Sequence, residues 1–118
     1  MSLREKQTAF AWKIADFLLW CKTEGYDITF GEVYRTIEQQ QHYVQIGRSK
    51  TMHSKHLDRL AVDLNLFIDG KLATAEQYRP LGEEWESRGG RWGGRFGVNP
   101  DDYSAKVGWD SNHFEMGD

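Results

Sequence analysis

Apolar side chains recur at helical spacing along the first segment of the chain, from about Leu3 to Thr23. Residues three or four positions apart lie on one face of an α-helix, and Gly25 follows as a stop signal. The pattern therefore predicts an amphipathic helix packed on the core. Its apolar positions are Leu3, Phe10, Ile14, Phe17, Leu18 and Cys21, and its aromatic residues, which we expect in the core or in a groove, are Phe10, Trp12, Phe17 and Trp20.

A second pattern, with a period of two, runs from Leu60 to Ile68. One face presents Leu60, Val62, Leu64, Leu66 and Ile68, and the other presents Ala61, Asp63, Asn65 and Phe67. Alternation of this kind is typical of a half-buried β-strand. Asp69 and Gly70 follow as a strong hairpin-turn signal, so we expect a return strand that begins at Lys71.

Shorter patterns predict the remaining elements. In chain order these are a strand over 26–34, a helix over 37–46, a loop over 47–55, a helix over 75–88 interrupted at 80–82, a glycine-rich loop over 89–97 and a final strand over 113–116. Thr36 and Gln39 match the capping box that begins a helix. Together the elements predict an α+β fold, with helices packed against a small antiparallel sheet.

Composition and charge exclude several classes of protein. The chain has 118 residues, which fits a single domain over 1–118, and its net charge of −3 argues against a nucleic-acid partner. No apolar run approaches the ~20 residues of a membrane span, and residues 1–7 lack the apolar core of a signal peptide. We therefore expect a chain that is made in the cytoplasm without a signal peptide and does not insert into membranes. We also expect a monomer.

A metal site, if present, must use His, Asp and Glu, because Cys21 is the single cysteine. Asp63 is the first candidate, since an aspartate within a strong strand is unfavourable without a partner. His56 lies in the preceding loop and is free to fold over the face that presents Asp63. A metal ion is one explanation of this pair, and a buried aspartate paired with an arginine is the other.

A second candidate cluster lies near the end of the chain, in the sequence Asp110-Ser111-Asn112-His113. If His113 begins the last strand, an antiparallel neighbour brings it beside Asp63. Asp110 then lies in the preceding turn, where its carboxylate can face water at a metal without coordinating the metal. Three protein ligands, an open fourth position and a nearby base are what a zinc hydrolase needs. The alternative for residues 110–112 is an ordinary Asx-type turn.

Four segments together resemble one family, in that family's order, over about residues 30–115. Residues 54–63 (SKHLDRLAVD) resemble the Ser-x-His-x-x-Gly-x-Ala-x-Asp motif of the peptidoglycan peptidases of family M15, and residues 110–115 resemble its second motif, an acidic residue three positions before a histidine. Tyr34-Arg35-Thr36 with Gln40 resembles its Tyr-Arg-(Ser/Thr)-x-x-x-Gln segment, and Trp92-Gly93-Gly94 matches a Trp-Gly-Gly often found before the second motif. Arg59 departs from the pattern, because it stands where glycine is usual. A position that needs a positive φ angle would strain an arginine.

The resemblance implies the fold shared by D-Ala-D-Ala peptidases and the Hedgehog signalling domain. It implies one Zn²⁺ held by His56, Asp63 and His113, although this donor set also suits other first-row ions. Asp110 would be the catalytic base that takes a proton from water at the zinc and passes it to the leaving amine. Arg35 would stabilise the oxyanion or anchor a substrate carboxylate.

Four further residues are candidates for substrate binding. Ser54 would contact substrate or orient the metal-binding loop, and Gln40 follows Arg35 in the resembling segment. Trp92 and Trp109 are expected to line the cleft, where a stem peptide or a sugar could stack. Core packing is the alternative explanation for each tryptophan.

Two residues adjoin the expected metal ligands. Glu115 shares a strand face with His113, so we expect it to support that ligand through a hydrogen bond rather than to bind the metal itself. His53 lies three positions before His56 and is the alternative ligand in this loop, although the resembling motif selects His56.

The sequence thus predicts a zinc-dependent peptidase acting on the stem peptide of bacterial peptidoglycan. An L-alanyl-D-glutamate endopeptidase of phage or prophage endolysin type is favoured, and it would reach the wall once the membrane is breached. A D,D-carboxypeptidase or dipeptidase of the same family is the alternative. A non-catalytic, zinc-containing wall-binding module is a second class, and Asp110 beside all three ligands argues against it. A metal-free domain, in which Asp63 pairs with Arg59 or Arg35, is the third.

Overall fold

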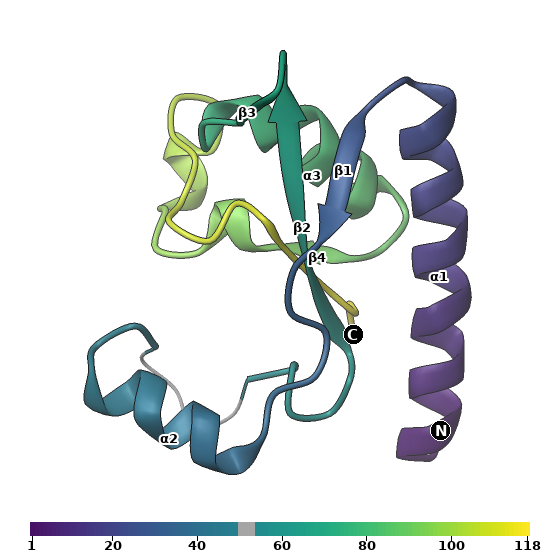
Figure 1. Ribbon diagram of the computed structural model, residues 1–118, viewed down its shortest axis with the longest axis vertical. Helices are drawn as coiled ribbons and strands as arrows, with labels where there is room; N and C mark the ends of the chain where they lie inside the picture. The colour runs from purple at the N-terminus through teal and green to yellow at the C-terminus, as the bar shows by residue number, and fades with distance from the viewer. Residues whose placement is uncertain (50–53) are drawn as a thin grey trace.

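Helices pack against a small antiparallel sheet in the computed structural model, which describes residues 1–49 and 54–118 (Figure 1). The described helices are α1 (Leu3–Thr23), α2 (Ile37–Gln45) and α3 (Arg79–Ser87), with short 3₁₀ helices η1 (Glu76–Tyr78), η2 (Gly93–Arg95) and η3 (Pro100–Asp102). The strands are β1 (Asp27–Phe30), β2 (Ala61–Ile68), β3 (Lys71–Leu72), β4 (Arg91–Trp92) and β5 (His113–Glu115). The expected α+β class is confirmed.

Strand β2 is the centre of the sheet. The order is β1-β2-β5-β4, and β3 pairs with the far end of β2 after the expected turn at Asp69 and Gly70. All the pairings are antiparallel. The register between β2 and β5 places Asp63 opposite His113. Two residues that are far apart in the sequence therefore lie side by side, as the sequence predicted.

The core lies between the sheet and the helices α1 and α3. Phe17 of α1 is fully buried, with its ring centroid 5.3 Å from that of Trp85 and 5.4 Å from that of Phe114. Burial of such large apolar surfaces is the main stabilising contribution to a domain of this size. The core residues are Phe10, Phe17, Cys21, Leu60, Val62, Leu64, Leu66, Tyr78, Leu81, Trp85, Trp92 and Phe114.

Helix α1 matches its predicted bounds, but one of its aromatic residues does not lie where we expected. Trp12 is 68% exposed, because its position on the helix lies opposite the face that buries Phe10 and Phe17. The expectation of a core or groove position for Trp12 is therefore wrong. Trp20 does pack against the core, with its ring stacked on Phe17 at 5.9 Å.

The glycine-rich segment 89–97 was expected to be a loop, and the structure corrects this, since the segment contains strand β4 and helix η2. Gly93 explains why glycine is needed here. A Cβ atom on Gly93 would lie 2.0 Å from the carbonyl oxygen of Asp110 and 2.8 Å from Cβ of His113. The close passage of this backbone therefore supports the turn that positions Asp110 and His113.

Helix α2 stands apart from the layered core and faces the end of the sheet that holds Asp63 (Figure 1). Thr36 begins the helix as predicted, since its hydroxyl accepts a hydrogen bond of 3.1 Å from the Gln39 amide. Gln40 is the buried residue of this helix. A cleft of about 320 Å³ separates α2 from the turn before β5, and it contains the expected site.

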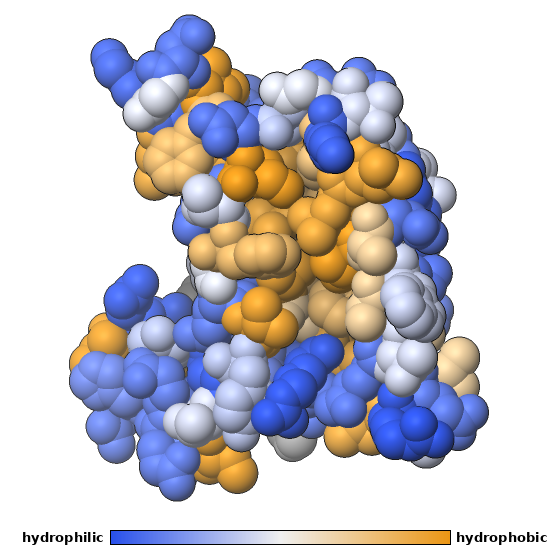
Figure 2. Space-filling view, turned by 45° about the vertical axis from the view of Figure 1, so that its right-hand side comes forward, coloured by the Kyte–Doolittle hydropathy of each residue, from blue (hydrophilic) through white to orange (hydrophobic). Residues whose placement is uncertain are grey.

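An apolar face is exposed on another side of the molecule, where Figure 2 shows hydrophobic side chains gathered together. Leu18, Ile28, Phe30 and Leu64 line a shallow groove between α1 and the sheet there. Among the described residues, no helix is both long and apolar enough to cross a membrane.

Candidate metal centre and active site

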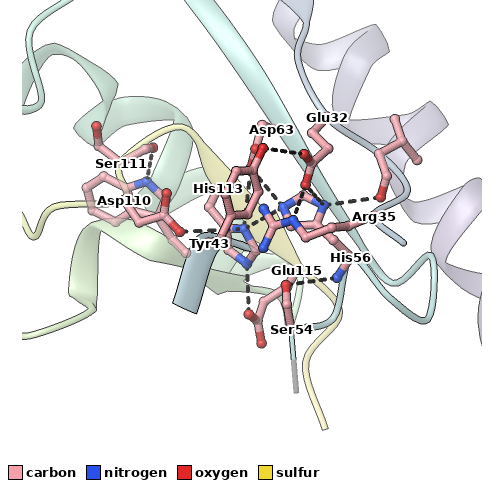
Figure 3. A network of polar contacts seen from close by, with 12 residues as sticks. Glu32, Arg35, Tyr43, Ser54, His56, Asp63, Asp110, Ser111, His113 and Glu115 are labelled. Carbon is pink, nitrogen blue, oxygen red and sulfur yellow. Dashed lines mark hydrogen bonds and ion pairs between the residues drawn. The ribbon is translucent and has the colours of Figure 1, made fainter. Parts of the chain in front are cut away.

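Three side chains from separate parts of the chain converge at one end of the cleft. His56 comes from the loop before β2, Asp63 from β2 and His113 from the first position of β5. His56 Nε2 lies 3.1 Å from Asp63 Oδ1, His113 Nδ1 lies 3.3 Å from the same oxygen, and the two nitrogens are 3.2 Å apart. The three donor atoms thus form a nearly equilateral triangle (Figure 3).

The size of this triangle fits a metal ion. Zinc ligands at about 2.0–2.1 Å in tetrahedral geometry lie roughly 3.3 Å from one another. The three observed separations fall within 0.2 Å of that value. Both histidines are buried, and the donor set of two imidazoles and one carboxylate is one that zinc accepts. The residues therefore suit a single ion at the cleft that they line.

Hydrogen bonds on the far side of each imidazole fix which nitrogen faces the centre. His56 Nδ1 donates to the carbonyl oxygen of Val33 at 3.1 Å, which leaves Nε2 as the donor atom. His113 Nε2 donates to Glu115 Oε1 at 2.8 Å, which leaves Nδ1. Partners of this kind orient metal-binding histidines and increase their basicity. Glu115 lies where the sequence predicted, behind His113.

The electrostatics of the centre favour a negative Asp63 and a positive His113 in the absence of metal. Burial alone would raise the pKa of the Asp63 carboxyl, but hydrogen bonds from His113 and His56 lower it to about 2. Burial alone would lower the pKa of His113, but hydrogen bonds with Asp63 and Glu115 raise it to about 9. A metal ion must therefore displace a proton from His113 at neutral pH.

Asp110 lies beside the triangle without belonging to it. Its Oδ2 is 3.7 Å from His113 Nδ1, and Figure 3 shows its carboxylate directed toward the centre from the side opposite Arg35. Burial raises the pKa of Asp110, and the negative charge of Asp63 adds to this effect. A half-buried carboxylate with a raised pKa next to a metal site suits a group that accepts and returns a proton.

Arg35 enters the cleft from the opposite side and is held in place by three neighbours. Its Nε donates to Glu32 Oε1 at 2.5 Å, and its Nη1 donates to Gln40 Oε1 at 2.7 Å. Its guanidinium carbon also lies 4.6 Å from the centroid of the Tyr43 ring. The Arg35 amide donates to the carbonyl oxygen of His56 at 3.2 Å, so this residue is tied directly to the metal-binding loop.

Of the four residues expected to bind substrate, two line the cleft and two are buried away from it. Ser54 and Trp109 line the cleft. Gln40 is fully buried and contacts Arg35, so it is placed to position Arg35 rather than to meet substrate. Trp92 is 1% exposed, and its indole N–H donates to the Ser111 carbonyl oxygen at 2.6 Å. The expectation that Trp92 lines the cleft is therefore wrong, and its core alternative holds.

Arg59 does adopt the left-handed backbone conformation that its position in the motif suggested, with φ at 57°. Its guanidinium carbon lies 4.0 Å from the centroid of the Tyr34 ring. The cation–π contact offsets part of the conformational strain. Neither Arg59 nor Arg35 pairs with Asp63, whose described partners are the two histidines, and this argues against the arginine-paired alternative.

Sequence reasoning missed several residues that line the site, among them Glu32, Tyr43, Arg48 and Phe96. Glu32 belongs to no motif, and only its position three residues before Arg35 hinted at an ion pair. Tyr43 Oη donates to Glu32 Oε2 at 3.4 Å. Phe96 packs against the His113 ring at a centroid distance of 5.5 Å. His53, the alternative ligand, lies outside the described residues.

Fold and site together describe an α+β domain in which His56, Asp63 and His113 could hold a metal ion, with the Asp110 carboxylate beside them. The model of the phage L-alanyl-D-glutamate peptidase family matches residues 18–116. The chain belongs to this family. It is 34% identical over 110 residues to the L-alanyl-D-glutamate peptidase of Listeria phage A118, an alignment that covers 83% of this chain and 36% of that protein. The chain thus spans about a third of the length of this relative.

Solved structures show the same fold. The L-Ala D-Glu endopeptidase ChiX of Serratia marcescens matches with a TM-score of 0.60 and 22% identity, over 77% of this chain and 67% of that one. The D,D-pentapeptidase VanY of a VanB-type vancomycin resistance cassette, solved in complex with Zn(II), matches with a TM-score of 0.60 and 23% identity, over 92% and 70%. The expected similarity to D,D-peptidases is therefore confirmed for the fold.

Proposed function

We propose that this chain is a zinc-dependent peptidoglycan peptidase that hydrolyses the bond between L-alanine and D-glutamate in the stem peptide. The observation that supports this most is the triangle of His56, Asp63 and His113 with Asp110 beside it. Membership of the phage L-alanyl-D-glutamate peptidase family and the Listeria phage relative support the choice of bond. The Zn(II) complex of VanY supports the choice of metal.

Each residue at the centre has a defined task in this hydrolysis. Zinc, when bound by the three ligands, lowers the pKa of water and polarises the scissile carbonyl. Asp110 accepts the proton that the attacking water loses. It then returns this proton to the amide nitrogen as the C–N bond breaks, so that the products are an alanine carboxylate and a glutamate amine. The raised pKa of Asp110 makes its carboxylate a stronger base toward the attacking water.

Arg35 stabilises the negative charge that develops on the carbonyl oxygen. Its contacts with Glu32, Gln40 and Tyr43 hold the guanidinium in one orientation before substrate arrives. A donor that is already oriented pays little reorganisation energy when charge develops. Glu32 and Gln40 are therefore positioning residues for Arg35, a role that also explains why Gln40 is buried.

The cleft and the rest of the chain fit a wall-degrading protein. Trp109 and Phe96, whose ring centroids lie 6.2 Å apart, give the cleft an apolar part, and Ser54 adds a hydroxyl to its lining, so the cleft suits a peptide. We propose that residues 1–118 act as one catalytic domain and as a monomer, on peptidoglycan reached after release from the cell that makes it.

A digest of purified peptidoglycan tests the proposal. The zinc-loaded chain should generate new amino termini that are D-glutamate (or its amide), identified by labelling and mass spectrometry. Asp110→Asn should abolish these termini while the zinc content stays the same. Release of D-alanine instead would show a D,D-carboxypeptidase. Binding to peptidoglycan without any new termini would show a wall-binding module, and both results would overturn the proposal.

A further inference from the structure

Among the described residues that line the cleft, one positive charge would stay unbalanced once a divalent ion is bound. The charged residues in this described lining are Glu32, Arg35, Arg48, Asp63 and Asp110, besides the two histidines. The negative charge of Glu32 is paired with Arg35. The two negative charges of Asp63 and Asp110 together would match the two positive charges of a divalent ion. Arg48 remains. Within residues 1–49 and 54–118 its guanidinium forms no ion pair with a carboxylate, and its side chain is exposed to the cleft. An anionic group on the substrate would supply the missing partner.

Arg35 is not available to clamp such an anion. A carboxylate binds an arginine most strongly through two adjacent guanidinium nitrogens. In Arg35, Nε is occupied by Glu32 and Nη1 by Gln40, so neither edge of the guanidinium has two free nitrogens. The guanidinium of Arg48 has neither edge occupied by a described partner, and its carbon lies 5.4 Å from the centroid of the Tyr43 ring. The two arginines are therefore suited to different tasks.

Arg48 is close enough to the reacting bond to bind a neighbouring group. Arg35 and Arg48 both contact the ring of Tyr43, at 4.6 and 5.4 Å, so their guanidinium carbons lie within 10 Å of each other. An extended peptide advances about 3.3–3.6 Å per residue. With Arg35 at the scissile carbonyl, Arg48 thus lies within reach of the residue that follows the bond.

Resting on the proposed function, we propose that Arg48 forms a carboxylate subsite that binds the free α-carboxylate of the D-glutamate residue after the scissile bond. In an L-Ala–γ-D-Glu stem peptide the chain continues through the side-chain carboxyl group, so the α-carboxylate is attached one atom from the scissile nitrogen. Amidation of this group to D-isoglutamine removes its charge. The subsite therefore makes the chain selective for stem peptides with unamidated D-glutamate.

Binding of the leaving fragment tests the subsite without requiring turnover. Calorimetry on the zinc-loaded chain should show that γ-D-Glu-L-Lys binds about tenfold more tightly than γ-D-isoGln-L-Lys, a ratio that a single exposed charge pair can supply. In Arg48→Gln the two fragments should bind within about twofold of each other, as an uncharged side chain makes no ion pair. Arg48→Lys should keep part of the preference, and 0.5 M salt should reduce it. Arg4→Gln, on the exposed end of α1, is the matched control and should leave the ratio unchanged.

Cleavage of the two matching stem peptides completes the test. Arg48→Gln should lower kcat/KM for the D-glutamate peptide about tenfold, mainly through KM, and leave the D-isoglutamine peptide unchanged. Equal kcat/KM for both peptides in the wild type, or an equal loss on both in Arg48→Gln, would overturn the subsite and leave the peptidase proposal intact. A charge-dependent binding preference without cleavage of either peptide would overturn the peptidase proposal and leave the subsite.

Discussion

His113 Nε2 donates a hydrogen bond of 2.8 Å to Glu115 Oε1, two residues further along the same strand. Both side chains are buried, and Glu115 is also approached by Lys55 at 3.6 Å and by Arg91 at 3.4 Å. This contact sets the ring orientation of His113 and directs Nδ1 toward Asp63. Strand β5 thus provides a proposed metal ligand together with the group that orients it.

Glu115→Gln should therefore weaken zinc binding about 10- to 100-fold, the usual cost of losing a carboxylate behind a histidine ligand. Competition with a chromophoric chelator measures the zinc affinity. Glu24→Gln, an exposed carboxylate at the end of α1, is the control and should bind zinc like the wild type. An unchanged affinity in Glu115→Gln would show that the contact does not orient the ligand.

Asp110→Asn should separate metal binding from catalysis. Asp110 lies outside the triangle of donor atoms, so zinc content should stay the same. The asparagine side chain cannot accept a proton, and kcat on a stem peptide should fall about 10²- to 10⁴-fold. Loss of zinc together with activity would place Asp110 among the ligands and contradict this assignment.

Zinc binding should release about one proton per chain at pH 7.5. The pKa of His113 in the metal-free chain is raised to about 9, so its imidazole is protonated at that pH, whereas the ligand form must be neutral. Zinc affinity should accordingly rise with pH until about pH 9. Calorimetry in buffers with different ionisation enthalpies counts the protons, and a count near zero would contradict the raised pKa.

The raised pKa of His113 also predicts how the stability of the metal-free chain depends on pH. A histidine whose pKa is raised in the folded state stabilises the fold below its unfolded pKa of about 6.5, and that contribution is lost as pH rises through the folded value. For His113 the loss falls between about pH 6.5 and 9. Urea unfolding across this interval should show the stability of the metal-free chain decreasing, with less decrease in His113→Gln.

Arg59 and Tyr34 should be energetically coupled. The guanidinium lies over the ring at 4.0 Å, and an exposed cation–π pair contributes about 0.5–1 kcal/mol. Tyr34→Ala should therefore destabilise the wild type by about this amount and have little effect in an Arg59→Gly background. Arg59→Gly alone should change the free energy of unfolding by less than about 1 kcal/mol, because relief of the left-handed backbone offsets the lost contact. Additive effects in the double variant would contradict the coupling.

The convergence of the proposed metal ligands could be predicted from the sequence because these residues leave local signals. Asp63 interrupts an apolar strand, and the register that pairs it with His113 follows from two antiparallel strands. The motif resemblance supplied the ligand set and the role expected of Asp110. The approximate bounds of helix α1 could be predicted from its periodicity and from the glycine that follows it.

The features that could not be predicted depend on packing between residues that are far apart in the sequence or joined by irregular backbone. Trp92 fills a slot between Gly82 and Gly94, where an added Cβ would lie 2.0 Å and 2.2 Å from the indole, and nothing near Trp92 in the sequence reveals Gly82 as a neighbour. Gln40 and Glu32 hold Arg35 through a bend of the chain that no periodic pattern describes. A motif identified Arg35, but the residues that orient it depend on the fold.

Metal analysis of the purified chain tests the central claim most directly, namely that His56, Asp63 and His113 hold one zinc ion. After equilibration with zinc and removal of excess, the account predicts about one zinc per wild-type chain and none in His56→Ala, with Asp110→Asn retaining about one. Circular dichroism should show the helices retained in each variant. A wild-type chain that binds no zinc, or a folded His56→Ala chain that binds as much as the wild type, would contradict the account.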